Sequence, residues 1–151
     1  METKMSEIDN SFLGRGWSFP PVFHSEGAQV AMVSGDEDVR QALQILMQTV
    51  KFSRLMHPEF YCDLEEFLFS NINSQTEAKI RSCIVKAILI NEHRVNVTMD
   101  DIQISQRPQS PSELDITVNY TVRSTNSRGN IVFPFYPQEG INVQMYAGAN
   151  T

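Results

Sequence analysis

The spacing of apolar residues changes once along the chain, near residue 91, and this change constrains the fold more than any other feature. Before it, two segments repeat apolar residues at every third or fourth position, which is typical of amphipathic helices. After it, apolar and polar residues alternate, most cleanly from Leu114 to Arg123. Helices followed by a strand meander predict an α+β domain, with two main helices packed on one face of a small antiparallel sheet.

Two capping boxes indicate where the helices begin. Ser34 with Glu37 precedes the first apolar stripe, and Ser74 with Glu77 precedes the second. We expect the second helix to end near Asn91, because asparagine tolerates the left-handed conformation that terminates many helices. The residues predicted to face the core are Val39, Leu43, Leu46, Met47 and Val50 in the first helix and Ile80, Ile84, Ala87 and Ile88 in the second, whereas Arg40, Gln41, Gln44 and Gln48 are expected on the surface.

Three stretches after the second helix suit strands. Apolar residues alternate with polar ones from Val95 to Ile104 and from Leu114 to Arg123, and residues 130–136 are rich in β-branched and aromatic side chains. The prolines in residues 106–112 predict a loop between the first two strands. Since Pro134 has no N–H to donate, we expect the last strand to lie at a sheet edge or to stop early.

The 151 residues correspond to one domain of ordinary size. Residues 1–10 are polar, and we expect them to be disordered. Residues 11–35 contain close glycines and the pair Pro20-Pro21, which excludes a helix. We expect this segment to wrap the domain as an aromatic N-terminal arm. The side chains expected to anchor it are Phe12, Trp17, Phe19 and Phe23.

Charge and hydropathy exclude several classes of function. The net charge of −6 argues against a nucleic-acid partner, because phosphate contacts need a basic face. No apolar run approaches the roughly 20 residues that a membrane span needs, so we expect no membrane partner. No apolar stretch follows a basic start, which predicts synthesis in the cytoplasm without a signal peptide. Cys62 and Cys83 form no CxxC pair, and we expect them to be reduced thiols.

Motifs for metals and cofactors are missing from the sequence. His24, His57 and His93 are far apart and have no metal-site spacing. The segment Gly14-Arg15-Gly16 lacks the third glycine of a dinucleotide loop, and no strand is predicted before it. We therefore expect no cofactor and no metal, and we interpret these glycines as residues needed for backbone conformation.

A hydrolase is the one enzyme class worth weighing. A muramidase needs two carboxylates across a cleft, one of them in an apolar setting. Glu65 and Glu66 lie in an apolar segment, but adjacent residues on a helix point apart. A non-enzymatic protein is the favoured interpretation, and a small muramidase acting on peptidoglycan remains the alternative.

Segments of the arm and of the junction after the second helix form a recognisable pattern. The arm reads LGRGWSFPP over residues 13–21, then MVSG at 32–35 leads into DVRQ at 38–41, and the junction reads NEHRV over 91–95. In this order the segments resemble the W-type baseplate wedge and sheath-initiator family, which has also carried a lysozyme-like label. Its members belong to contractile phage tails, phage-derived injection systems and type VI secretion baseplates. The resemblance covers about residues 12–104 well and the final strands more loosely.

The resemblance implies a structural role. Members of this family dock on the helix bundle of the baseplate wedge proteins and template the first ring of contractile sheath subunits, within a sixfold assembly. Sheath strands can add to the sheet of such a domain by β-augmentation. Spike or hub proteins are further candidate partners. The resemblance implies a protein that is cytoplasmic during assembly and then part of the baseplate of a phage tail or a tail-like particle.

Glu-Pro-Arg after the long helix is the hallmark of this family, used for docking on the wedge bundle. Here Glu92 and Arg94 match, and His93 replaces the proline. In an extended segment, residues two apart point to one face, so the carboxylate and the guanidinium can meet a partner together or pair within the chain. We expect partner binding by Glu92, His93 and Arg94. Arg15 and Trp17 are further candidates, although a buried anchor is the commoner role of a tryptophan.

Overall fold

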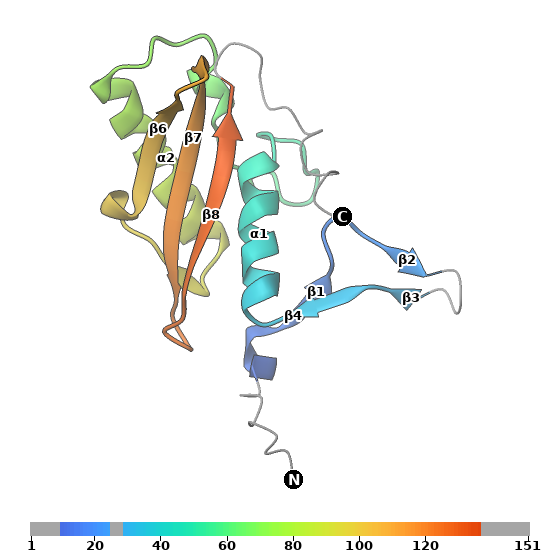
Figure 1. Cartoon of the computed structure of the whole chain (residues 1–151). Helices are drawn as coiled ribbons and strands as arrows, with labels where there is room; N and C mark the ends of the chain where they lie inside the picture. Colours follow the sequence, from blue (N-terminus) through green and yellow to red (C-terminus); the bar gives the residue numbers. More distant parts are fainter. Residues whose placement is uncertain (1–9, 25–28, 137–151) are drawn as a thin grey trace.

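Strand β7 (Ser110–Val122) is the centre of the sheet in the computed structural model, which describes residues 10–24 and 29–136 (Figure 1). On one side it pairs antiparallel with β8 (Arg128–Phe135). On the other side it pairs with β6 (Ile102–Arg107) and with the short β5 (Val95–Asn96). A 3-10 turn (Met99–Asp101) separates β5 from β6, so the strand predicted from Val95 to Ile104 is two strands in line.

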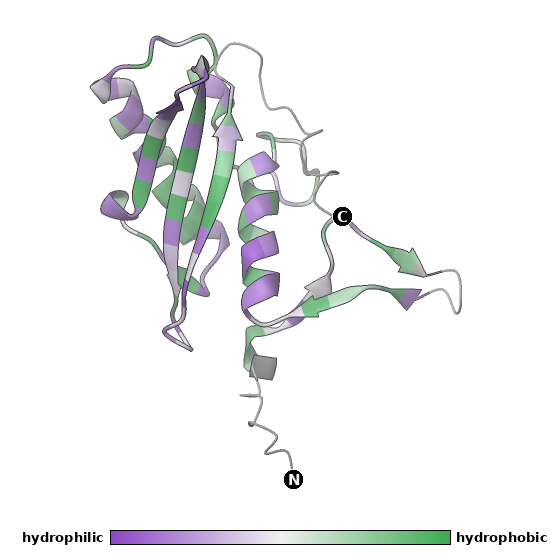
Figure 2. Ribbon diagram, in the orientation of Figure 1, coloured by the Kyte–Doolittle hydropathy of each residue, from purple (hydrophilic) through white to green (hydrophobic). Residues whose placement is uncertain are grey.

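Both main helices pack on one face of this sheet, as predicted (Figure 1). Helix α1 (Asp36–Gln48) contacts β8, and α2 (Ser74–Asn91) contacts β5 and the 3-10 turn before β6. The helices cover only one face because apolar residues alternate with polar ones along β7 (Figure 2). Alternate side chains of a strand point to opposite faces, so the apolar side chains of β7 gather on the face that the helices cover. The buried residues of β7 are Leu114, Ile116, Val118, Tyr120 and Val122.

Hydrogen bonds show which backbone groups of the sheet face outward. The N–H of Val122 donates to the carbonyl of Ser127 at 2.8 Å, so even-numbered residues of β7 direct their backbone groups to β8. The register between β7 and β8 then directs the backbone groups of Val132 and Pro134 to the outer side of β8. The N–H that Pro134 lacks would therefore face away from β7. The expectation of an edge strand is confirmed among the described residues.

Helix α1 differs from the prediction at its start and on its surface. Ser34 lies in strand β4 and gives no cap, and Gly35 precedes the helix with a φ of 66°. Gln41 and Gln44, expected on the surface, are buried. Gln41 accepts a 2.7 Å hydrogen bond from the N–H of Phe19 in the arm, which compensates the burial of its amide. The apolar stripe is confirmed up to Met47, whereas Val50 lies beyond the helix and is exposed.

Helix α2 begins with a different cap from the one predicted. The N–H of Thr76 donates to Oδ1 of Asn73 at 2.8 Å, so Asn73 and not Ser74 caps the helix. The helix ends at Asn91 as expected, but without a left-handed residue there, because the side chain of Asn91 donates to the carbonyl of Ala87 instead. Neither helix in the described part of the chain is long and apolar enough to cross a membrane.

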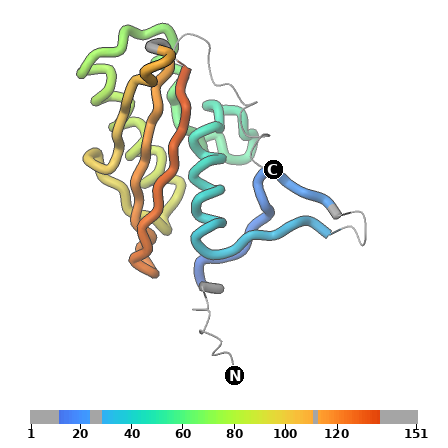
Figure 3. Tube along the Cα trace, in the orientation of Figure 1, coloured from blue at the N-terminus to red at the C-terminus, as the bar shows by residue number. Residues whose placement is uncertain are grey.

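The arm projects from the domain and does not wrap it (Figures 1 and 3). Strand β1 (Arg15–Trp17) pairs with β4 (Met32–Ser34), and β2 (Phe23–His24) pairs with β3 (Gln29–Val30), all antiparallel. The expectation of aromatic anchors is wrong for Phe12, Trp17 and Phe23, which are more than half exposed, whereas Leu13 is buried in the core.

Two connecting segments join the strands and the helices. The predicted loop over 106–112 is a tighter hairpin turn, because β6 continues to Arg107 with a bulge and β7 begins at Ser110. Between the helices, the chain is irregular apart from the 3-10 turn Glu65–Phe67. The expected disorder of residues 1–10 falls outside the described residues, except for Asn10.

Candidate functional site

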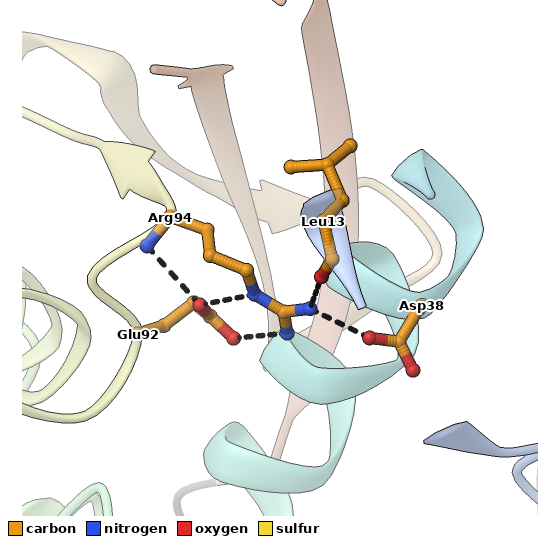
Figure 4. Close-up of polar contacts among 4 residues, drawn as sticks. All are labelled: Leu13, Asp38, Glu92 and Arg94. Atoms are coloured by element: carbon orange, nitrogen blue, oxygen red, sulfur yellow. Dashed lines mark hydrogen bonds and ion pairs between the residues drawn. The ribbon is translucent and has the colours of Figure 1, made fainter. Parts of the chain in front are cut away.

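Arg94 lies where the chain leaves α2 and enters β5, and its guanidinium binds both oxygens of Glu92. Nε donates to Oε1 at 2.8 Å and Nη2 donates to Oε2 at 2.7 Å (Figure 4). The N–H of Arg94 also donates to Oε1 of Glu92, at 3.2 Å. This planar two-point contact is the strongest geometry available to an arginine and a carboxylate. It fixes the direction of the guanidinium at the end of α2.

The remaining nitrogen of the guanidinium reaches two other segments. Nη1 donates to Oδ2 of Asp38, in the first turn of α1, at 2.6 Å. It also donates to the carbonyl of Leu13, in the arm, at 2.8 Å. One side chain therefore ties together the arm, the start of α1 and the junction between α2 and β5 (Figure 4). We call Leu13, Asp38, Glu92 and Arg94 the Arg94 clamp.

The electrostatics of the clamp favour the charged form of Arg94. The side chains of Glu92, Asp38 and Arg94 are 10, 15 and 29 % exposed. The hydrogen bonds with Glu92, and then that with Asp38, raise the pKa of Arg94 above its ordinary value. Two carboxylates face one cation, but Asp38 also lies at the positive end of the α1 dipole, which stabilises the second negative charge.

The two glycines of the arm make room for the clamp. Gly14 has a φ of 91°, which lets the chain turn between Leu13 and strand β1 without strain. A Cβ on Gly16 would overlap the carboxylate of Asp38. The interpretation of these glycines as conformational residues is confirmed for Gly14 by its φ, and Gly16 adds a close approach to α1.

The structure brings Glu92 and Arg94 together, as predicted, although His93 and Arg94 form a turn and not an extended segment. The charges of Glu92 and Arg94 are paired within the chain, which is one of the two possibilities that the sequence left open. His93 is exposed between them. Arg15 and Trp17 are exposed on β1, so the buried role considered for Trp17 is wrong. Contact of these five residues with a partner stays a prediction.

Sequence reasoning missed two members of the clamp. A signal for Asp38 is present in the sequence, since the residue belongs to one of the family-like segments and lies in the first turn of α1. The carbonyl of Leu13 had no signal, because any residue carries one. Eighty-one positions separate Leu13 from Arg94, and no local pattern predicts that contact.

The carboxylates considered for a muramidase do not form a buried pair. Glu65 and Glu66 lie side by side on the short 3-10 turn and are both exposed. Glu66 lines a groove of about 600 Å³ between this turn and α2, and Asp63 in the same groove pairs with Lys51 at 2.9 Å. The part of the chain that the structure describes contains no cluster of His, Cys, Asp and Glu able to hold a metal ion.

Comparison with known families defines the class of protein: a small α+β structural component of a baseplate. The chain belongs to the family described as "Baseplate wedge protein gp25", whose profile matches residues 33–127. None of the curated proteins compared with the chain matches it.

Two solved structures are similar to this chain. A protein from Geobacter sulfurreducens, provisionally named a tail lysozyme, is 34 % identical, with a TM-score of 0.62, over 69 % of this chain and 92 % of that one. A chain of the anti-feeding prophage (AFP) baseplate, in a sixfold symmetrised cryo-EM structure, is 23 % identical, with a TM-score of 0.61, over 85 % and 90 %. At that identity the second likeness concerns the fold alone.

Replacing Arg94 with alanine should destabilise the fold, because it leaves two largely buried carboxylates without their cation. We expect a loss of about 2–3 kcal/mol in the free energy of unfolding. Arg40→Ala is the matched control, since its partner Glu37 is well exposed, and it should cost under about 1 kcal/mol. Equal losses for the two variants in urea denaturation would contradict a structural role for the clamp.

Proposed function

We propose that this protein joins the baseplate wedge to the contractile sheath. It docks on the helix bundle of the wedge proteins through the arm and the adjoining turn at residues 92–94, and it offers a sheet edge to the first ring of sheath subunits. The observation that carries the proposal is an aromatic surface that is exposed on the arm while the base of the arm is held by the Arg94 clamp.

The exposed surface of the arm suits a protein partner. Trp17 is 63 % exposed and makes an edge-to-face contact with Phe23, with 6.5 Å between ring centroids. Met32, opposite Trp17 in the hairpin, is also exposed. Aromatic residues gathered on a surface favour protein interfaces, where they contribute much of the binding energy. An amphipathic helix of the wedge bundle would supply the apolar stripe that covers them.

Glu92 and Arg94 act in this proposal mainly by positioning the arm. Their charges are neutralised within the clamp. They are therefore less available to a partner than an unpaired carboxylate and guanidinium would be. Arg15, exposed at the base of the hairpin, is a charged side chain in the described part of the arm that suits a partner carboxylate. Charge reversal at Arg94 would disrupt the clamp itself, and a docking test therefore needs a residue outside it.

The outer side of β8 is the sheet edge that we assign to the sheath. Val132 directs its backbone groups outward and exposes its apolar side chain on the face away from the helices. The other edge is less suited, because Arg81 donates to the carbonyl of Ile102 at 3.2 Å and a bulge interrupts β6 at Gln106. Main-chain hydrogen bonds from an added strand would complete the β8 edge.

The proposed partners are wedge proteins and the sheath protein, with spike or hub proteins as further contacts. The fold likeness to a chain of a sixfold symmetrised baseplate supports a sixfold assembly. We propose that the protein is cytoplasmic while the baseplate assembles and afterwards belongs to the particle.

We also propose that the protein is not an enzyme. The name of the Geobacter relative favours a muramidase as the second candidate. However, Glu65 and Glu66 are exposed neighbours, whereas a general acid needs an apolar environment that raises its pKa. Clearing of a cell-wall suspension that is lost in Glu65→Gln or Glu66→Gln would establish the muramidase instead.

Trp17→Ala should abolish docking without unfolding the protein. Because Trp17 is mostly exposed, we expect the free energy of unfolding to change by less than about 1 kcal/mol. In cells that express the complete particle, electron micrographs should show few sheathed particles. Leu55→Ala is the matched control, since Leu55 is 95 % exposed in another segment, and it should leave assembly unchanged. Normal particles with Trp17→Ala would overturn the role of the arm.

Val132→Pro should block the β8 edge, because it removes an outward N–H while the hydrogen bonds between β7 and β8 remain. We expect the variant to fold, as checked by circular dichroism, and to enter baseplates that lack sheath in electron micrographs. Gln106→Pro is the control at the opposite edge, where the backbone also faces outward, and it should allow sheath assembly. Loss of sheath with Gln106→Pro alone would assign the sheath to β6.

A further inference from the structure

The two cysteines of the chain lie close together although they come from different segments. Cys62 belongs to the irregular segment between the helices, and Cys83 belongs to α2. The two thiols are near enough for each to shift the pKa of the other. The thiol of Cys83 also approaches the carbonyl of Asp63, next to Cys62, at 3.6 Å. The fold therefore places the Cys83 thiol against the backbone beside Cys62, across the boundary between a helix and a loop.

The surroundings of the two thiols differ. Cys62 is only 3 % exposed and is part of the hydrophobic core. Cys83 is half-buried and lines the groove of about 600 Å³ between α2 and the segment at residues 51–67. Three lysines and three acidic residues line the same groove, so its charges are balanced: Lys51, Lys79, Lys86, Glu59, Asp63 and Glu66. A small molecule in the groove can therefore reach Cys83 before it reaches the buried Cys62.

The hydrogen bond between the thiols gives them different acidities. It lowers the pKa of Cys83, because Cys62 donates to the Cys83 thiolate. The same hydrogen bond, together with burial, raises the pKa of Cys62. The accessible thiol is thus the one that ionises more readily, as an attacking cysteine requires.

We propose that Cys62 and Cys83 form an oxidisable dithiol site whose reactant is a small-molecule disulfide such as oxidised glutathione. The thiolate of Cys83 attacks one sulfur of the reagent, forming a mixed disulfide and releasing one glutathione thiolate. Cys62 then loses its proton, attacks the sulfur of Cys83 and releases the second glutathione. The two protein thiols are oxidised to one intramolecular disulfide, and one molecule of oxidised glutathione is reduced to two of glutathione.

The consequence of this bond is local. It would link the segment between the helices to the middle of α2 and close a loop from residue 62 to residue 83. Reducing surroundings, such as cytosolic glutathione, keep the thiols free, and an oxidising exterior would close the bond after the fold has formed. This inference does not depend on the docking of the arm or of the sheet edge.

The test is incubation of the folded, full-length protein with oxidised glutathione, followed by intact mass spectrometry under native and unfolding conditions. We expect the monomer to lose the mass of two hydrogen atoms, with peptide mapping to a Cys62–Cys83 link. The thermal midpoint should rise by roughly 10 °C. A stable glutathione adduct on the wild-type protein, a disulfide-linked dimer, or unreacted thiols until the protein unfolds would each overturn the proposal.

Single variants assign the two roles. Cys62→Ala should stop at one glutathione adduct on Cys83, because no thiol is left to resolve it. Cys83→Ala should stay unmodified in the folded state, since Cys62 is buried. Modification of Cys62 in the folded Cys83→Ala variant would contradict the proposed order. If Cys62→Ala does not fold, the wild-type mass and mapping still decide whether the bond forms.

Discussion

The guanidinium of Arg94 is the interaction on which the rest of this architecture depends. Its two-point contact with Glu92 fixes its direction, and its remaining nitrogen holds both Asp38 and the carbonyl of Leu13. Three segments far apart in the sequence meet at this one side chain. A lysine could not replace it, because a single ammonium group lacks the planar fork that contacts Glu92 while also reaching the other two groups.

This constraint explains how the arm can project and still be ordered at its base. The arm has few core contacts of its own, since Leu13 is buried but Phe12, Trp17 and Phe23 are exposed. The clamp and the hydrogen bond from Phe19 to Gln41 fasten it to α1. A hairpin fixed in this way loses little conformational entropy when a partner covers its aromatic residues, which favours binding. The docking proposal for this baseplate wedge family member rests on that preorganisation.

Local patterns were enough to predict the layers of the fold. The alternation around Ile116 and Val118 predicts the strand that is central in the sheet, and the missing N–H of Pro134 predicts an edge strand or an early stop, of which the structure has the edge strand. The helix starts were predicted less well, because the N-cap residues are Gly35 and Asn73, whereas Ser34 and Ser74 were expected. A capping box is a short motif, and the path of the preceding strand or loop decides which residue caps the helix.

The candidate site was predicted in part, since Glu92 and Arg94 were identified but Asp38 and Leu13 were not. The pairing of residues 92 and 94 is local, whereas the contacts to the arm and α1 depend on the tertiary fold. The direction of the arm could not be predicted either, because aromatic residues at this spacing suit burial against the domain or exposure to a partner equally well.

Hydrogen exchange of the arm is the most direct measurement of the central claim, that the Arg94 clamp holds the arm in place. Backbone amides of β1 and β4 should be protected in the wild-type protein. In Arg94→Ala their protection should fall by about tenfold or more, and by a larger factor than that of amides between β7 and β8. Equal protection of β1 and β4 in the two proteins would contradict the account.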